Sequence, residues 1–321
     1  MRLLFLSFVF LLVSQAGAFA NSQSFFDWLE EFKQDAAREG ISQHTLNEAF
    51  AGVQPIPRVI ELDRKQPEGT MTFAQYRERV INNARIQQGR QMLYDHKAEL
   101  EAVSAKYGVQ PQYIVALWGI ETSYGNNTGG FKVVDSLATL AYDGRRSSFF
   151  RKELINALKI IDEGHVDAAH MKGSWAGAMG QNQFMPSSFH AYAVDHNGDG
   201  KRDIWGSLPD VFGSTANYLS RSGWHDGERW GREVSLPAGF SQSLTGVDVK
   251  KSLREWQKAG VRLPGGGDLP ASEDMEASVV VPDGLGGPAY LVYHNYRVVM
   301  RWNKSVYFAT SVGLLADAIV K

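Results

Sequence analysis

The sequence predicts a mainly α-helical protein that carries a small antiparallel β subdomain toward its C-terminal end. Up to about residue 224, apolar residues recur at the three- and four-residue spacing of helix faces, and one segment is apolar on every side. After that point, short runs rich in β-branched and aromatic residues stand between glycines and prolines, which is typical of strands joined by turns. The 321 residues suffice for one large core and a smaller subdomain.

The N-terminal segment has the composition of a secretory signal peptide. Arg2 is followed by the apolar run from Leu3 to Val13, and small residues then place an Ala-x-Ala cleavage site at Ala18 and Ala20. We expect residues 1–20 to direct export to the periplasm. The chain has no cysteine, which excludes disulfides, thiolate metal sites and a lipid-modified cysteine, so the exported protein is expected not to be lipid-anchored.

Charge and missing motifs exclude several function classes. The chain has 33 Lys and Arg against 35 Asp and Glu, a formal net charge of −2, which does not point to nucleic acid as a partner. The histidines lack the spacing of zinc ligands, and neither a Gly-x-Ser-x-Gly motif nor a phosphate-binding loop is present. Nothing in the sequence requires more than a monomer.

The first part of the exported chain is expected to be a helical domain over residues 21–108. Apolar residues between positions 24 and 50 lie on one helix face, with a break near Gly40. A proline-containing stretch follows, in which Leu62 to Glu68 is expected to be extended or irregular. The pattern from Thr72 to Tyr107 is again helical.

The segment that begins at Pro111 predicts a buried helix with one acidic residue at its end. Proline suits the first turn of a helix, residues 113–120 are apolar on all sides, and Gly125 is expected to terminate the helix. Glu121 is the carboxylate at this end. Burial against apolar groups raises a carboxyl pKa, as a general acid near neutral pH requires. The alternative is a helix-terminal glutamate that turns to solvent.

A second polar segment lies within the expected core domain, residues 109–224, among helices predicted near 136–142, 151–163 and 209–222. Residues 172–189 combine small residues with amide and hydroxyl groups and several aromatic rings. Such mixtures of hydrogen-bonding groups and apolar faces bind sugars. The alternative is a packed loop whose glycines only serve turns.

The stretch that follows resembles an EF-hand calcium loop. Oxygen-bearing side chains occupy loop positions 1, 3, 5 and 9, with glycine at position 6: Asp195, Asn197, Asp199, Asp203 and Gly200. Position 12 is Gly206 instead of the usual glutamate, so Asp210 is the nearest carboxylate that could complete the site. The loop predicts a structural Ca²⁺, with a metal-free Asx-rich turn as the alternative. No cofactor is expected for catalysis.

The expected β subdomain spans residues 225–303, and residues 304–321 are expected to be a helix that packs back on the core. Four runs in the subdomain have strand composition: 233–236, 261–263, 278–281 and 290–302.

In their order and spacing, these segments resemble the lytic transglycosylases of the membrane-bound lytic murein transglycosylase B type. The resemblance covers about Leu62 to Ala316. It is carried by four linked segments: Asp63-Arg64-Lys65-Gln66-Pro67-Glu68, Glu121-Thr122-Ser123-Tyr124-Gly125, Arg145-Arg146-Ser147, and residues 173–189 followed by the EF-hand-like loop. It implies a lysozyme-like helical core with a flanking helical domain and a small β subdomain. The implied reaction cleaves the β-1,4 bond between N-acetylmuramic acid and N-acetylglucosamine and leaves 1,6-anhydro-N-acetylmuramic acid ends.

The resemblance also implies roles for individual residues. Glu121 matches the family's single catalytic acid and base. The implied sugar and peptide contacts are Tyr76, Arg145, Arg146, Ser174, Gln181, Gln183, Phe184, Met185 and Asn303. The implied ion ligands are Asp195, Asn197, Asp199, Lys201 through its carbonyl, and Asp210. Peptidoglycan glycan strands are the implied partner, and cell-wall synthesis proteins are a further partner class.

Two other readings of the sequence stay open at this stage. A hydrolytic muramidase would use a second carboxylate, for which Asp135 and Asp143 are candidates, although both suit helix caps or loops better. A non-catalytic peptidoglycan-binding protein would use Glu121 only as a packed helix end.

Overall fold

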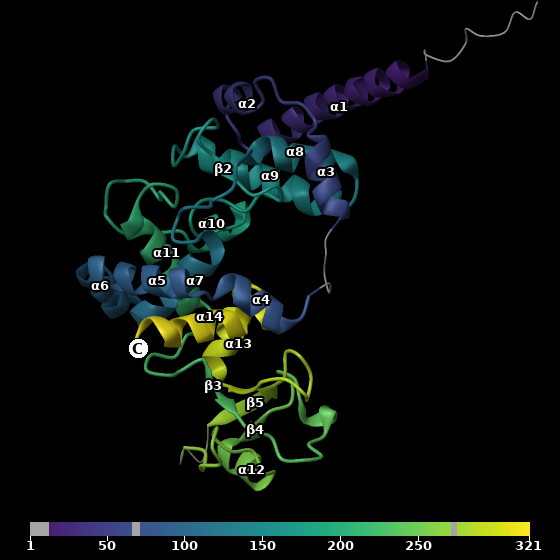
Figure 1. Cartoon of the computed structure of the whole chain (residues 1–321). Helices are drawn as coiled ribbons and strands as arrows, with labels where there is room; N and C mark the ends of the chain where they lie inside the picture. Colours follow the sequence, from purple (N-terminus) through teal and green to yellow (C-terminus); the bar gives the residue numbers. More distant parts are fainter. Residues whose placement is uncertain (1–12, 66–70, 271–274) are drawn as a thin grey trace, which may run out of the picture. The chain divides into compact units, whose positions relative to one another are not determined.

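The computed structural model describes residues 13–65, 71–270 and 275–321, which divide into two compact units (Figure 1). The first unit comprises Met1–Gln66, Gly129–Met179 and Phe184–His190; the second comprises Pro67–Thr128, Gly180–Gln183 and Ala191–Lys321. Residues 1–12 of the expected signal peptide lie outside the described residues. The five-part division expected from the sequence stays a prediction.

The first unit is built from helices that surround a largely apolar interior. In chain order they are α1 (Val13–Arg38), α2 (Gln43–Ala49), α3 (Pro57–Arg64), α8 (Val133–Asp143), α9 (Ser147–Asp162) and α10 (Pro186–Tyr192), whose last residues belong to the second unit. Strands β1 (Phe131–Lys132) and β2 (Lys172–Gly173) form a short antiparallel pair. The expected helix pair around Gly40 is confirmed, and Phe25 and Phe32 on its apolar face are fully buried.

The structure contradicts the irregular conformation expected for the first residues of this stretch, Leu62 to Arg64. Pro57 occupies the first turn of α3, where a proline costs no hydrogen bond, and the helix runs on to Arg64. Val59 and Asp63, four residues apart, are the buried side chains of this helix. The burial of an acidic residue hid the helical pattern in the sequence. Residues 66–70 of the same motif lie outside the described residues.

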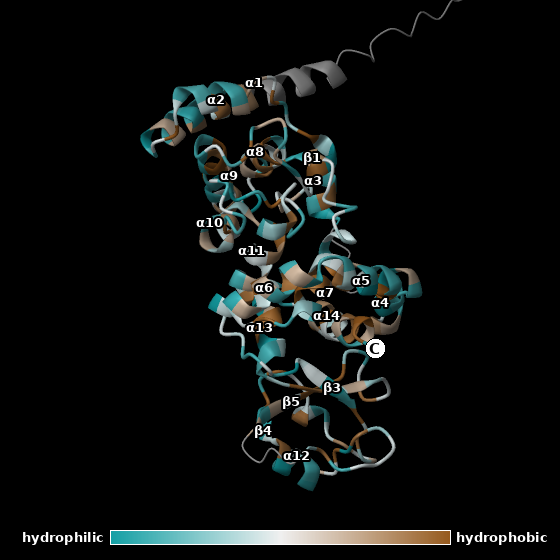
Figure 2. Ribbon diagram, turned by 90° about the vertical axis from the view of Figure 1, so that its left-hand side faces the viewer, coloured by the Kyte–Doolittle hydropathy of each residue, from teal (hydrophilic) through white to brown (hydrophobic). Residues whose placement is uncertain are grey.

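The helices outside the β part of the second unit include the apolar helix that ends near Glu121. They are α4 (Phe73–Val80), α5 (Asn83–Asp95), α6 (Lys97–Tyr107), α7 (Pro111–Thr122), α11 (Leu208–Arg221), α13 (His294–Trp302) and α14 (Val306–Ile319). Helix α7 packs against α14 and α5, and both α7 and α14 carry hydrophobic stretches in Figure 2. The side chains from Tyr113 to Trp118 are buried, as the all-round apolar pattern predicts.

A four-stranded antiparallel sheet forms the β part of the second unit. Its spatial order is β3 (Gly231–Val234), β6 (Ala289–Val292), β5 (Glu276–Val280) and β4 (Lys251–Ser252). Trp256 of α12 (Leu253–Lys258) is fully buried in the same apolar cluster as Val279 and Leu291. The small antiparallel β subdomain predicted from the sequence is therefore confirmed.

Two of the four predicted strands are wrong in part. Only residues 290–292 of the run 290–302 are in a strand, as the last part of β6, and His294–Trp302 is helix α13. Its aromatic and β-branched residues suggested a strand, but Asn295, Tyr296, Val298 and Val299 are buried at helical spacing. The run 261–263 makes only an isolated bridge, between Arg262 and Ser235.

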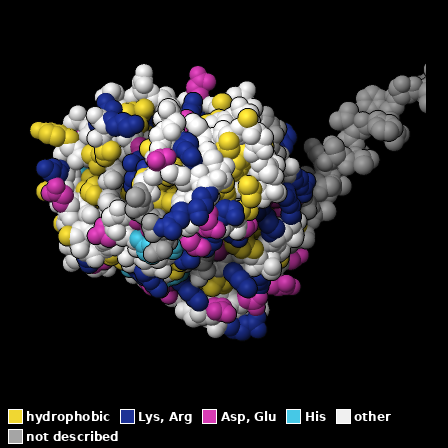
Figure 3. All heavy atoms as spheres, turned by 90° about the horizontal axis from the view of Figure 1, so that it is seen from below, with side chains coloured by type: hydrophobic (Ala, Val, Ile, Leu, Met, Phe, Trp, Pro, Cys, Tyr) yellow, Lys and Arg dark blue, Asp and Glu magenta, His cyan; other side chains and the backbone are white. Residues whose placement is uncertain are grey.

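The surface gives two further observations. No helix in the described part of the chain is long and apolar enough to cross a membrane. On the face drawn in Figure 3, lysine and arginine side chains are interspersed with aspartate and glutamate. This face therefore presents no broad patch of one sign, in keeping with the small net charge of the chain.

Candidate active site

Glu121 lies in the last turn of α7, directly before a sharp reversal of the chain. Ser123 caps the helix in the left-handed conformation with φ 51°, and Tyr124 follows with φ 58°. The Ser123 N–H donates to the carbonyl of Gly119 at 3.1 Å. The helix thus ends at Thr122, three residues before Gly125, which the sequence suggested as terminator. Two successive non-glycine residues in this region are unusual and need support from their surroundings.

That support comes from α5 and from the close approach of Tyr124 to α7. The Tyr124 hydroxyl donates to the Arg85 carbonyl at 2.8 Å, and the Arg85 guanidinium donates to Ser123 Oγ at 2.7 Å. The Tyr124 ring lies over Gly119, where a Cβ atom would come within 2.7 Å of ring atoms. The absence of a side chain at Gly119 is therefore what lets the chain fold back beside Glu121.

The environment of Glu121 favours the neutral acid. Desolvation by burial raises the pKa of Glu121 to about 7, although a hydrogen bond from the Trp302 indole nitrogen to Glu121 Oε1, at 2.7 Å, lowers it. Among the described residues, no second acidic group contributes to this shift. Burial also raises the pKa of the Tyr76 hydroxyl, and the charge of Glu121 adds to that effect, so Tyr76 lies within electrostatic reach of Glu121.

Gln181 joins the end of α7 to the exit of the EF-hand-like loop. Its side-chain oxygen accepts from Trp118 Nε1 at 2.8 Å, and its side-chain nitrogen donates to the carbonyl of Trp205 at 2.9 Å. Its backbone N–H donates to the Ile204 carbonyl, and its own carbonyl accepts from Thr122 Oγ1. Both ends of the Gln181 amide are thus engaged within the protein, one by Trp118 of α7 and the other by Trp205.

The other two predicted contact residues of the second unit are also held by the backbone. Gln183 has φ 51°, and its side-chain nitrogen donates to the carbonyls of Thr128 and Gly180, each at 3.0 Å. Asn303 follows the last residue of α13, is exposed, and its side-chain oxygen accepts from the Ser305 N–H at 3.0 Å.

Five of the predicted contact residues belong to the first unit. Ser174 Oγ accepts from the Ala178 N–H at 3.1 Å, within the segment of residues 172–189. Phe184 is only 2% exposed and its backbone pairs with that of Met179, whereas Met185 is half-buried. Arg145 and Arg146 are the remaining two.

A buried carboxylate fixes the two arginines. Asp63 is 1% exposed and forms ion pairs with Arg145, at 3.3 Å, and with Arg146. Arg145 also donates to the Asp63 carbonyl at 2.6 Å. The side chains of Arg145 and Arg146 nevertheless stay half-exposed. The motif that contains Asp63 was singled out in the sequence, but this function of the residue was not.

Trp302 is the neighbour of Glu121 that the sequence did not reveal. It lies 181 residues further along the chain, in a run that was expected to be a strand. Its adjacency to Asn303 is the only signal that could have drawn attention to it. No spacing rule connects an indole with a carboxylate over such a separation.

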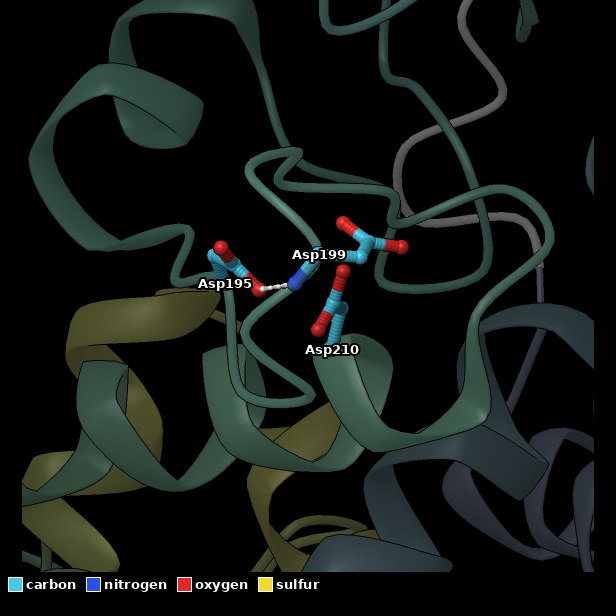
Figure 4. A group of neighbouring side chains, drawn as sticks. All are labelled: Asp195, Asp199 and Asp210. Carbon is cyan, nitrogen blue, oxygen red and sulfur yellow. Dashed lines mark hydrogen bonds between the residues drawn. The ribbon is translucent and has the colours of Figure 1, made fainter.

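The EF-hand-like loop gathers three carboxylates (Figure 4). One oxygen from each of Asp195, Asp199 and Asp210 lies within 4.8 Å of the others. Asp210 is fully buried and accepts the backbone N–H groups of His196, at 2.7 Å, and Asp203, at 2.8 Å. Converging carboxylates repel one another, and oxygen donors of this kind suit a hard cation such as Ca²⁺. The donor set therefore fits the ion that the loop pattern predicts.

Comparisons with known proteins agree with one another. A family model described as the transglycosylase SLT domain matches residues 24–317. The membrane-bound lytic murein transglycosylase B of Escherichia coli (strain K12) is 29% identical over 323 residues, which span 96% of this chain and 85% of that protein.

Solved structures extend the likeness to the fold. SltB3 from Pseudomonas aeruginosa, in complex with NAG-anhNAM-pentapeptide, is 49% identical with a TM-score of 0.91, covering 93% of this chain and 80% of that one. The Escherichia coli lytic transglycosylase Slt35, in complex with calcium, is 30% identical with a TM-score of 0.78 and covers 94% of each chain. The predicted mainly α fold is thus confirmed. The chain belongs to the transglycosylase SLT domain family of lytic transglycosylases and shares its lysozyme-like fold.

Proposed function

We propose that this chain cleaves the β-1,4 bond between N-acetylmuramic acid and N-acetylglucosamine in peptidoglycan, and that it leaves 1,6-anhydro-N-acetylmuramic acid ends. The observation that carries the proposal is the carboxyl group of Glu121, whose pKa is raised to about 7 by desolvation. A group with this pKa is a competent acid when protonated and a competent base when ionised, both near neutral pH. The complex of the relative SltB3 with an anhydro-sugar peptide supports the product.

In this proposal Glu121 acts twice in one turnover. The protonated carboxyl donates its proton to the glycosidic oxygen as the bond to that oxygen breaks. The resulting carboxylate then takes the proton from the C6 hydroxyl of the same muramic acid, whose oxygen forms the new bond to C1. Glu121 thus regains the proton that it donated, and no water molecule is consumed.

Because the proposed mechanism uses a single carboxylate, another group must stabilise the positive charge that develops on the sugar. Glycosidases that use water rely on a second carboxylate across the bond. In the second unit, no acidic group of the described residues perturbs the pKa of Glu121. We infer that the N-acetyl group of the substrate itself supplies this stabilisation.

We further propose residues that contact the glycan and its stem peptide. Gln183 and Asn303 each have one end of the side-chain amide fixed by the backbone, which orients the other end. Arg145 and Arg146 are held by Asp63 with their side chains half-exposed, an arrangement suited to the carboxylates of a peptide. The remaining contacts that we propose are Tyr76, Ser174, Gln181, Phe184 and Met185.

A structural calcium ion and export to the periplasm complete the proposal. Asp195, Asn197, Asp199, the Lys201 carbonyl and Asp210 would hold the ion, whose charge would offset that of the three carboxylates. The calcium complex of the relative Slt35 supports this assignment. The substrate lies outside the cytoplasm, in agreement with the signal-peptide pattern of residues 1–20.

The catalytic role of Glu121 is tested by fragment release from purified peptidoglycan sacculi. The wild-type protein should release soluble muropeptides, and Glu121→Gln should lower the rate by at least about a thousandfold while the protein still binds sacculi. Glu99→Gln, which removes an acidic group from the neighbouring helix α6, should retain the wild-type rate. Equal release by the Glu121→Gln variant and the wild type would show that Glu121 is not the catalytic group.

A further inference from the structure

The hydrogen bond between Trp302 and Glu121 has a direction that the chemistry of the two groups fixes. An indole N–H can only donate, and it has no lone pair with which to accept a proton. Trp302 Nε1 lies 2.7 Å from Glu121 Oε1, so Oε1 is the acceptor. Among the described residues, Trp302 alone is hydrogen-bonded to the Glu121 side chain.

The indole is held in place independently of Glu121. The ring of Tyr218 packs against that of Trp302 with 4.7 Å between centroids, and the ring of Tyr192 packs on Tyr218 at 4.2 Å. The Tyr218 hydroxyl donates to the carbonyl of Arg301 at 2.8 Å, and Arg301 donates to the Ser222 carbonyl at 2.7 Å. These contacts hold the C-terminal end of α13 against α11. The direction of the indole N–H toward Glu121 is therefore set by contacts other than the hydrogen bond to Glu121.

The two oxygens of Glu121 are therefore not equivalent. In the neutral acid, the carbonyl oxygen is the better acceptor and the hydroxyl oxygen carries the proton. Since Oε1 accepts from the indole, the acidic proton belongs on Oε2. In the carboxylate, Oε1 keeps its charge-assisted bond to the indole, which leaves Oε2 as the oxygen that can take a new proton.

We propose that Trp302 is a positioning residue that reserves Oε1 of Glu121, so that both proton transfers of the reaction pass through Oε2. This inference rests on the proposed catalytic role of Glu121 and adds the atom at which the proton leaves and returns. The same oxygen donates to the glycosidic oxygen and then accepts from the C6 hydroxyl, so the side chain need not rotate between the two steps. The hydrogen bond from the indole also lowers the pKa of Glu121, against the rise caused by desolvation. It thereby stabilises the ionised carboxylate that the second step requires.

Two variants at position 302 separate the N–H group from the ring. Trp302→Phe keeps an aromatic ring beside Tyr218, and replacement of Trp302 by β-(3-benzothienyl)alanine keeps the full bicyclic shape but has sulfur in place of the N–H. Trp224→Phe is the matched control, because Trp224 Nε1 donates its hydrogen bond to Gln110 Oε1, at 2.8 Å, and not to Glu121. Thermal melting of each variant reports whether the fold is retained.

The first measurement is the pKa of the Glu121 carboxyl group, followed by carbon NMR in protein labelled at the glutamate side-chain carboxyl. The Glu121 signal is identified by its loss in Glu121→Gln. Removal of the indole N–H should raise this pKa by about one pH unit, because a hydrogen bond to a charged group stabilises the carboxylate by roughly that much. Trp224→Phe should leave the pKa where it is.

The second measurement is the initial rate of fragment release from sacculi between pH 5 and 9. Both replacements of Trp302 should lower the rate by about tenfold or more and move the alkaline limb of the profile upward with the pKa. A folded benzothienylalanine variant with the wild-type pKa and rate would overturn the proposal, as would an effect confined to Trp302→Phe, which would mean that only ring packing matters. Activity retained by Glu121→Gln is a separate result that overturns the proposed function itself.

Discussion

At the scale of single residues, the raised pKa of Glu121 ties stability to pH. Its pKa is 4.5 as an isolated group and about 7 in the folded protein, so the folded state binds the proton more tightly than the unfolded state. Stability from this group is fully present below pH 4.5 and is lost as pH rises through 7. At one pKa unit per 1.4 kcal/mol, the shift of about 2.5 units makes this loss at most about 3.5 kcal/mol.

Glu121→Gln should remove this pH-dependent loss. The amide keeps an oxygen that can accept from Trp302 but cannot ionise, so the variant should melt several degrees above the wild type at pH 8 and at nearly the same temperature at pH 4.5. Thermal melting across this pH range measures the difference. A variant that is less stable than the wild type at pH 8 would mean that the carboxylate is not desolvated in the folded protein.

Asp63 allows a second prediction at this scale. Its carboxylate is buried beneath Arg145 and Arg146, so Asp63→Asn should destabilise the first unit by about 2 kcal/mol by weakening the buried ion pairs. Asp143→Asn is the matched control, because Asp143 pairs at 2.8 Å with Arg64, whose side chain is largely exposed, and should cost less than about 1 kcal/mol. Denaturant unfolding of both variants checks the ranking, and equal losses would contradict it.

Sequence reasoning at the residue scale succeeded where a property was local. Glu121 stood out because a carboxylate ended an apolar helix, and the structure confirms the buried helix and the raised pKa. Trp302 and the burial of Asp63 were out of reach, because both depend on segments that are far apart in the chain. The resemblance implies that Gln181 contacts sugar, which stays a prediction, and the sequence did not reveal the hydrogen bonds of its amide to Trp118 and Trp205.

At the scale of elements, the end of α7 depends on one glycine. In Gly119→Ala, a Cβ atom would meet the Tyr124 ring at 2.7 Å, which should force apart the reversal that follows Glu121. We expect a loss of about 1 to 3 kcal/mol in stability and a lower rate of fragment release. Gly286→Ala, where a Cβ atom meets nothing within 4 Å, should leave both unchanged. Wild-type behaviour of Gly119→Ala would show that the reversal tolerates displacement.

The EF-hand-like loop gives a second prediction for an element. Addition of Ca²⁺ to chelator-treated protein should raise its melting temperature, because a ligand that binds only the folded state stabilises that state. Asp199→Asn should weaken this response at least tenfold in Ca²⁺ concentration, since it removes one of three converging carboxylates. Asp226→Asn, at an exposed aspartate outside the loop, should respond like the wild type. A wild-type protein whose melting temperature ignores Ca²⁺ would contradict the assignment.

Most errors at the element scale arose from composition. Residues 294–302 are rich in valine and aromatic residues, which favour strands, yet their buried positions follow a helical repeat. The short α3 was missed because its buried face includes Asp63. Long apolar segments such as α7 and α14 were predicted well, because a continuous pattern leaves little room for another structure.

At the scale of the whole molecule, the fold class and family could be predicted from the order of the motifs, and the comparisons confirm both. The division into two units, each made of separate stretches of the chain, could not be predicted, because it depends on which elements contact one another. Glu121 and its indole partner lie in the second unit, whereas the arginine pair and Ser174 lie in the first.

The most direct test of the central claim is the origin of the oxygen at the new sugar ends. Sacculi would be digested in water enriched in ¹⁸O by the wild-type protein and by Glu121→Gln, and the soluble fragments analysed by mass spectrometry. Lytic transglycosylation through Glu121 predicts fragments that are one water lighter than hydrolytic products, contain no ¹⁸O and are missing with the variant. Fragments with reducing ends that carry ¹⁸O would show that water attacks the bond, and would contradict the account.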